Sequence, residues 1–412
     1  MIADHPNAPS GVGTQTKYVI ESLLSTGRYK ITCFGGAIKH PDYRPQIVEP
    51  YGEDCIVYPV DGYGTQEQLR SMLWTEKPDI LWFMTDPRFY EWLWDIENEI
   101  RSLVPMVYYH VWDNYPAPQY NKKWYQSNDV IACISKLTHN VVGEVAPDVE
   151  RHYVPHAVNS NVFYKKTPEE LKEFKDSSFG KDYDKVTFFW NNRNARRKMS
   201  GSVLWWFNEF AEEVGPENVR LIMHTDPLDK NGQNLLSIIH DLGADDGRVQ
   251  VSRSKISPEA LAAIYNAVDC TINISDAEGF GLATLESLSC GTPIIANMTG
   301  GLQEQVTDGE NVFGVAIEPS SKAIIGSQQV PYIYEDRINR EDFINALRKM
   351  YNMSKEEREK LGELGMEHVQ KNYNFEKFRN SWIDLMDHIH NKYGSWENRA
   401  NRDTRWSLTE IS

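Results

Sequence analysis

Short apolar segments alternate with longer amphipathic segments along most of the chain, and this alternation constrains the fold more than any other feature. The apolar segments have the length of single β-strands. They lack the strict polar–apolar alternation of half-exposed strands, as expected of strands buried on both faces. Buried strands separated by helices are typical of parallel sheets covered by helices. The sequence therefore predicts an α/β fold.

Eleven segments are predicted as strands, and because that number is large for one open sheet, two sheets are expected. The predicted strands are 31–34, 55–59, 79–84, 105–110, 130–134, 186–190, 219–224, 248–251, 270–274, 293–296 and 313–317. The helices that stand out between them are 14–25, 202–213, 258–267 and 282–290. The join between the sheets is predicted in 151–184. We therefore expect domains over 1–160 and 161–375, followed by a helix and polar tail over 376–412.

Composition places the chain among ordinary globular proteins and excludes several classes. Its 412 residues carry 43 Lys and Arg against 59 Asp and Glu, a net charge of −16. The acidic balance is spread over both halves, which disfavours binding driven by nucleic-acid phosphates. No apolar segment reaches the length of a membrane helix. Five cysteines without a C-x-x-C pair argue against a disulfide framework. The sequence predicts a soluble, cytoplasmic protein.

The beginning of the chain is unusual for a doubly wound domain. Only Met1–Ala3 precede a glycine-containing loop at Pro6–Gly13, where a full central strand is expected. Either the first strand is very short or the natural start lies upstream of Met1. We expect the second.

The most informative segment is 269–306, which reads as strand, turn, helix, turn and strand. The turn contains Glu278-Gly279-Phe280-Gly281, and Glu286 follows within the next helix. Glycines let a ligand approach the backbone, and a helix N-terminus offers free amides and a positive dipole end. The segment therefore predicts an anion site suited to phosphate, with one carboxylate near a reaction centre and another for ligand hydroxyls. A helix start with favourable acids is the simpler alternative.

Three further features are candidate ligand contacts. Arg193 and Lys198 follow the strand 186–190, where two cations suit a diphosphate, although a solvated basic turn is the alternative. Gly13 closes a loop before a helix that Thr14 could cap, and a tight turn without a ligand is the alternative. His110 ends the strand 105–110, at the edge where parallel sheets bind ligands, and a structural histidine is the alternative.

The string from Glu278 to Glu286 resembles the E-x7-E motif of retaining glycosyltransferases of the GT-B fold, in particular glycosyltransferase family 4. The resemblance continues through Gly291-Thr292-Pro293 and Gly300-Gly301, and Arg193 and Lys198 match the family's Arg-x4-Lys pair. It implies two Rossmann-like doubly wound domains facing a central cleft. It also implies transfer of a sugar from a nucleotide-diphosphate sugar to an acceptor hydroxyl with anomeric retention.

The resemblance assigns roles residue by residue. It implies that Glu278 lies by the donor sugar and that Glu286 binds the ribose hydroxyls. Arg193 and Lys198 would stabilise the departing diphosphate, and His110 would contact the donor sugar. The backbone amides of Phe280, Gly281 and Leu282, with Gly13, would contact the sugar and phosphates. The implied enzyme needs no metal or other cofactor, although Asp182-Tyr183-Asp184 spells the D-x-D pattern of metal-dependent transferases.

The acceptor is less well defined than the donor. A run of aromatic residues is the candidate acceptor wall, because rings stack on sugar faces, while core packing or a protein interface are equal alternatives. These residues are Tyr108, Tyr109, Trp112, Tyr115, Tyr120, Trp124 and Tyr125. A glycan, a lipid-linked sugar or a small molecule would each fit. A nucleic-acid acceptor is disfavoured by the charge balance but left open, as is the oligomeric state.

Two other functions fit the same motifs. A nucleotide-sugar epimerase of the same fold would convert its substrate without an acceptor, whereas a transferase needs one. A non-catalytic binder of nucleotide-sugars is disfavoured because Glu278, Glu286, Arg193 and Lys198 are all present.

Overall fold

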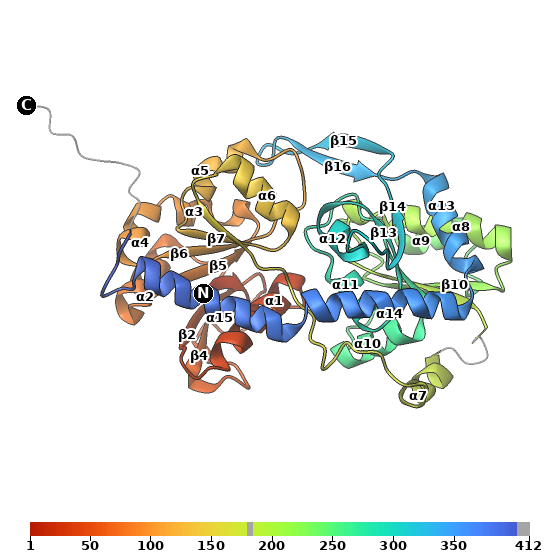
Figure 1. Cartoon of the computed structure of the whole chain (residues 1–412), viewed down its shortest axis with the longest axis horizontal. Helices are drawn as coiled ribbons and strands as arrows, with labels where there is room; N and C mark the ends of the chain where they lie inside the picture. Colours follow the sequence, from red (N-terminus) through yellow and green to blue (C-terminus); the bar gives the residue numbers. More distant parts are fainter. Residues whose placement is uncertain (179–183, 402–412) are drawn as a thin grey trace, which may run out of the picture. The chain divides into compact units, whose positions relative to one another are not determined.

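The computed structural model describes residues 1–178 and 184–401, which form two compact units (Figure 1). Unit 1 contains residues 1–157, 327–330 and the described residues from Glu376 onward. Unit 2 contains residues 158–326 and 331–375. Asp182 of the D-x-D pattern and most of the predicted polar tail lie outside the described residues.

Unit 1 is built on an eight-stranded sheet in the order β3-β4-β2-β1-β5-β6-β7-β8. Every pairing is parallel except that of β3 with β4. The strands are β1 Ile2–Asp4, β2 Ile31–Gly36, β3 Gln46–Ile47, β4 Cys55–Pro59, β5 Leu81–Thr85, β6 Met106–His110, β7 Val130–Cys133 and β8 Glu150–Tyr153. The helices are α1 Gly11–Leu24, α2 Gln66–Glu76, α3 Glu91–Trp94, α4 Glu97–Leu103, α5 Lys122–Tyr125, α6 Lys136–Val145 and α15 Phe375–Tyr393.

Unit 2 has a fully parallel six-stranded sheet in the order β11-β10-β9-β12-β13-β14, plus an antiparallel hairpin of β15 and β16. The strands are β9 Val186–Asn191, β10 Val219–His224, β11 Val249–Ser252, β12 Cys270–Asn273, β13 Ile294–Asn297, β14 Gly314–Ile317, β15 Ser321–Ile325 and β16 Ile333–Arg337. The helices are α7 Pro168–Ser178, α8 Ser200–Val214, α9 Leu235–Asp241, α10 Pro258–Ala267, α11 Leu282–Ser289, α12 Gln303–Val306, α13 Arg340–Asn352 and α14 Lys355–Asn372. Helices α8, α9 and α13 pack together, as do α10, α11 and α14, so both faces of the sheet are covered (Figure 1).

The strand order of unit 2 determines where a ligand can bind. From the central strand β9, the chain moves outward through β10 and β11, and it then returns to β12 and moves the opposite way. In such sheets the crevice for a ligand lies at the carboxyl ends of the two strands where the order reverses. Here these are β9 and β12, which are followed by the loops containing Lys198 and Glu278.

The structure confirms the predicted α/β class and parallel sheets, and it corrects two local predictions. A strand, β8, overlaps the start of the segment predicted as the join and pairs with β7. The strand before the glycine-containing loop is β1, between β2 and β5, and a natural start upstream of Met1 stays a prediction. Helix α1 begins at Gly11 rather than at Thr14, because the Ser10 side chain accepts a hydrogen bond from the Gly13 amide and caps it earlier.

Candidate functional site

Lys198 and Glu278 form the centre of the candidate site in unit 2. The Lys198 ammonium contacts the Glu278 carboxylate, and their side chains are only 9% and 13% exposed. Burial alone would raise the pKa of Glu278, but the positive charges of Lys198 and Arg197 hold that pKa below its usual value. Glu278 is therefore ionised at neutral pH, and the two opposite charges compensate each other.

The N-terminus of α11 lies directly after Glu278 in the chain. Gly281 is its first flanking residue and has a φ of +95°, a conformation that glycine adopts without strain. A Cβ at this position would lie 2.6 Å from the side chain of Leu302. Among the described residues, no side chain caps this helix, so its first amides and its dipole remain available for an anion.

Glu286 lies further along α11 and contacts a small polar chain. The Tyr265 hydroxyl donates to Glu286 Oε2 at 3.0 Å, and Asn191 Nδ2 donates to the same hydroxyl at 2.8 Å. Burial raises the pKa of Glu286 to about 7, and the hydrogen bond from Tyr265 only partly opposes this effect. The carboxyl group therefore changes charge near neutral pH.

The cations after β9 are each held by a carboxylate or a carbonyl. Arg193 donates to Asp229 at 2.6 and 3.3 Å, and its side chain is 63% exposed. Arg197 donates to the carbonyl oxygen of Ala277 in the Glu278 loop. Arg193 and Lys198 therefore contact different carboxylates rather than one common group.

The base of the β15–β16 hairpin supports the Glu278 loop. Asp336 donates its amide to the carbonyl of Asp276 at 2.8 Å, and buried Glu335 pairs with Arg196. Asp276 is buried, which raises its pKa to about 6 together with the nearby negative charge of Glu335. Sequence reasoning did not identify Asp276, Glu335 or Asp229. Their partners lie far away in the sequence and are brought together only by the fold. Glu335, for example, lies 139 residues from its partner Arg196.

Phe280 and Leu282 occupy different environments in the turn. The Phe280 side chain is buried and packs edge-on against Tyr373, with ring centroids 5.8 Å apart. Leu282 is the first residue of α11 and is partly exposed. Phe280 thus anchors the turn through its ring, and its carbonyl oxygen accepts a hydrogen bond from Gln305 Nε2 at 2.6 Å.

Gly13 and His110 lie in unit 1, and the structure gives each a packing role. The Gly13 amide already donates to Ser10 Oγ at 2.9 Å, and a Cβ there would lie 2.6 Å from the Ala8 carbonyl oxygen. His110 is fully buried, with Nδ1 3.0 Å from the Tyr108 hydroxyl and Nε2 2.7 Å from the Tyr125 hydroxyl. Desolvation lowers the pKa of His110 to about 3, so the ring is neutral. Their donor-binding roles stay predictions.

Most of the aromatic run belongs to the core of unit 1. Tyr108, Tyr109, Trp112 and Tyr125 are buried, whereas Tyr115, Tyr120 and Trp124 are partly exposed. Only these last three rings of the run offer surface to an acceptor.

A second group of polar side chains in unit 1 was not connected by the sequence. One carboxylate and two imidazoles lie together there, those of Glu150, His152 and His388.

The fold and these motifs define a class of protein. Comparison with solved structures shows the GT-B fold, with two Rossmann-like domains. Sucrose-phosphate synthase from Thermosynechococcus elongatus superposes with a TM-score of 0.73 at 17% identity, over 93% of this chain and 94% of that one. HepE from Anabaena, solved in complex with UDP and glucose, superposes with a TM-score of 0.67 at 14% identity, over 92% and 97% of the two chains.

Sequence comparison identifies a narrower region. Residues 238–350 match the family model described as Glycosyl transferases group 1, and this region contains Glu278 and Glu286 but not Arg193 or Lys198. D-inositol 3-phosphate glycosyltransferase from Acidothermus cellulolyticus is 39% identical over 79 residues. That alignment covers 19% of this chain and 17% of the relative, so the chain spans about a sixth of the relative's length. Among the helices that the structure describes, none is both long and apolar enough to cross a membrane.

Proposed function

We propose that this protein is a glycosyltransferase that moves a hexose-type sugar from a nucleotide-diphosphate sugar to an acceptor hydroxyl, with retention of anomeric configuration and without a metal. The observation that carries the proposal is the convergence of Lys198, Glu278 and the uncapped N-terminus of α11 at the switch point of the unit 2 sheet. The group 1 match over 238–350 supports it.

The diphosphate would bind at the N-terminus of α11. The amides after Gly281 point along the helix axis, and Lys198 lies beside them through its contact with Glu278. When the glycosidic bond breaks, negative charge accumulates on the diphosphate. A positioned ammonium and a helix dipole stabilise that charge without rearranging solvent.

The two glutamates would divide the recognition of the donor. A diphosphate that takes over the Lys198 ammonium leaves the Glu278 carboxylate with unused acceptor oxygens, which the sugar hydroxyls would fill. Glu286 would accept hydrogen bonds from the ribose, while Tyr265 holds its other side. Arg193 would rotate from Asp229 toward the phosphates, since its side chain is largely exposed.

The acceptor would be a glycan, a lipid-linked sugar or a small molecule, bound with help from unit 1. We propose the cytoplasm as its location. All five cysteines are buried as free thiols, which suits a reducing compartment.

A panel of uridine, guanosine, adenosine and thymidine diphosphate sugars tests this function. One donor is expected to raise the melting temperature and to release its nucleoside diphosphate, slowly with water and faster with a suitable acceptor. Glu278→Gln should remove the release and keep the fold, whereas Lys165→Ala, a change in an exposed ion pair with Glu363, should behave like the wild type.

Two outcomes would reject the proposal. Conversion of a nucleotide-sugar to its epimer without an acceptor would indicate an epimerase. Binding of a donor with no turnover under any acceptor would indicate a non-catalytic binder.

A further inference from the structure

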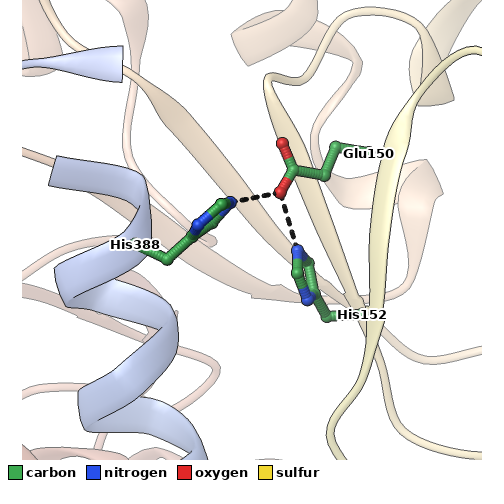
Figure 2. Close-up of side chains that lie close together, drawn as sticks. All are labelled: Glu150, His152 and His388. Carbon is green, nitrogen blue, oxygen red and sulfur yellow. Dashed lines mark hydrogen bonds and ion pairs between the residues drawn. The ribbon is translucent and has the colours of Figure 1, made fainter. Parts of the chain in front are cut away.

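Glu150, His152 and His388 lie together on the surface of unit 1 (Figure 2). Glu150 and His152 are two residues apart on the edge strand β8, so their side chains leave the same face of the sheet. His388 reaches them from α15, 236 residues further along the chain. The fold therefore brings together three groups that no sequence motif connects.

The three groups converge on one point. His152 Nε2 lies 2.8 Å from Glu150 Oε1, and His388 Nε2 lies 2.6 Å from the same oxygen. The three ligand atoms all lie within 4.8 Å of one another. Figure 2 shows both rings presenting a nitrogen to the same carboxylate oxygen.

The second carboxylate oxygen of Glu150 is fixed by two other groups of α15. Lys392 Nζ lies 2.7 Å and the Tyr393 hydroxyl 2.5 Å from Oε2. These two contacts come from neighbouring positions at the end of α15, on the opposite side of the carboxylate from the imidazoles. The carboxylate is thus oriented with Oε1 directed at the imidazoles, as outer hydrogen bonds orient metal ligands in known sites.

We propose that Glu150, His152 and His388 form a binding site for a divalent transition metal, and that zinc fits this ligand set. Zinc binds imidazole nitrogen and carboxylate oxygen at about 2.0–2.2 Å in a tetrahedron, so its ligand atoms lie roughly 3.3 Å apart. Small movements of the rings away from Oε1 create that spacing, and each neutral ring then carries its proton on Nδ1 so that Nε2 offers a lone pair to the ion.

The exposure of the cluster allows an ion to enter and a water to complete its coordination. The side chains of Glu150, His152 and His388 are 17%, 38% and 44% exposed. Three protein ligands and one water form an open zinc site. The ammonium of Lys392 opposes the ion through charge repulsion, so we expect moderate affinity.

The bound ion would link two distant parts of the chain within unit 1. It would tie α15 to the edge strand β8, whose outer edge pairs with no other strand among the residues that the structure describes. The site is independent of the proposed transferase function, since neither Lys198 nor Glu278 takes part in it.

Zinc titration of the full-length, untagged protein tests the site after treatment with a chelator and desalting. Wild-type protein is expected to bind one zinc ion in competition with a chromophoric chelator, and its melting temperature should rise with zinc concentration. His152→Ala and His388→Ala should each weaken binding on the order of tenfold or more. His390→Ala is the matched control, because it removes an exposed imidazole from the same helix.

A gain-of-binding variant separates metal coordination from structural damage. Lys392→Met removes the repelling charge, while the Tyr393 hydroxyl still holds Glu150 Oε2, so this variant should bind zinc more tightly than the wild type does. Circular dichroism of the zinc-free variants checks that they fold. The proposal is overturned if the wild type shows no saturable zinc binding, or if both histidine variants bind as it does.

Discussion

Lys198 and Glu278, the proposed catalytic pair, also contribute to stability. Each charge is buried and is compensated by the other, so removing one leaves the second charge without its partner. Lys198→Met is expected to lower the free energy of unfolding by about 3 kcal/mol. The double variant Lys198→Met with Glu278→Gln should recover most of that loss, because no uncompensated charge remains.

Activity, unlike stability, should not recover in the double variant. Both the single and the double variant should release nucleoside diphosphate at least about 100-fold more slowly than the wild type, since both lack the ammonium proposed to stabilise the leaving phosphate. Urea denaturation and a nucleotide-release assay measure the two quantities separately. Lys165→Met, which breaks an exposed pair, should change stability by less than about 1 kcal/mol. Recovery of activity in the double variant would contradict the assigned role of Lys198.

Glu286 predicts a pH dependence of donor use. Its pKa is raised by burial to about 7, so the carboxyl group loses its charge as the pH falls below 7. An ionised carboxylate is the stronger acceptor for ribose hydroxyls. We expect kcat/KM for the donor to rise about threefold or more between roughly pH 6 and 8, and Glu286→Gln to abolish this rise.

The contribution of Glu286 to stability should fall as the pH rises, whereas kcat/KM should rise, and this difference makes the test specific. Because its folded-state pKa lies above the ordinary value of 4.5, the folded protein binds more protons than the unfolded chain between about pH 4.5 and 7. The contribution of this group to stability is therefore lost as the pH rises through that window. A rise in kcat/KM cannot come from better folding, and its persistence in Glu286→Gln would exclude this carboxyl group as the cause.

Helix α11 depends on one glycine for its position. Gly281→Ala places a side chain in a left-handed conformation, at a cost of about 1–2 kcal/mol, and also presses it against Leu302. Gly243→Ala is the matched control, because it has a φ of +63° but no atom within 4 Å of the new Cβ. Thermal melts should show a larger loss for Gly281→Ala, and only this variant should lose affinity for nucleoside diphosphates. Equal effects of the two substitutions would contradict the positioning role of the turn.

Elements with a strong apolar pattern were predictable from the sequence, and those without it were not. The buried strand β4 and the Pro-initiated helix α10 have the predicted bounds, since apolar residues and capping signals coincide there. Strand β8 has the sequence Glu-Arg-His-Tyr and lies at a sheet edge, so its polar residues gave no strand signal. The β15–β16 hairpin was not predicted, although its Glu335 and Asp336 support the Glu278 loop.

In the candidate site, the residues of the motifs were predictable from the sequence, but their contacts were not. Glu278, Glu286 and Lys198 were identified because their spacing in the chain carries the motif. Their partners Tyr265 and Asn191, and the pairing of Arg193 with Asp229, depend on which loops the sheet brings together. The position of His110 at a strand end was predictable from the sequence. Its hydrogen bonds were not, because the two tyrosine hydroxyls that contact its ring nitrogens are brought there by the fold.

Across the whole molecule, similarity of fold extends much further than similarity of sequence. Solved GT-B structures superpose on more than nine-tenths of the chain, whereas the family model matches 238–350 within unit 2. We propose that the part that binds the donor is the part with a recognisable sequence. Unit 1, where acceptor choice would be decided, has its own buried aromatic core, and its sheet is wound like that of unit 2 with the edge strands β3 and β8 added.

The proposed donor site is tested most directly by calorimetric titration of the full-length protein with nucleoside diphosphates. The wild type is expected to bind one equivalent of the preferred diphosphate. Lys198→Met should weaken that binding by about tenfold or more, because it removes a charge-assisted contact to phosphate. Lys165→Met should leave it unchanged. Saturable binding that is equally strong in wild-type and Lys198→Met protein, or no binding of any nucleoside diphosphate, would contradict a donor site at the N-terminus of α11.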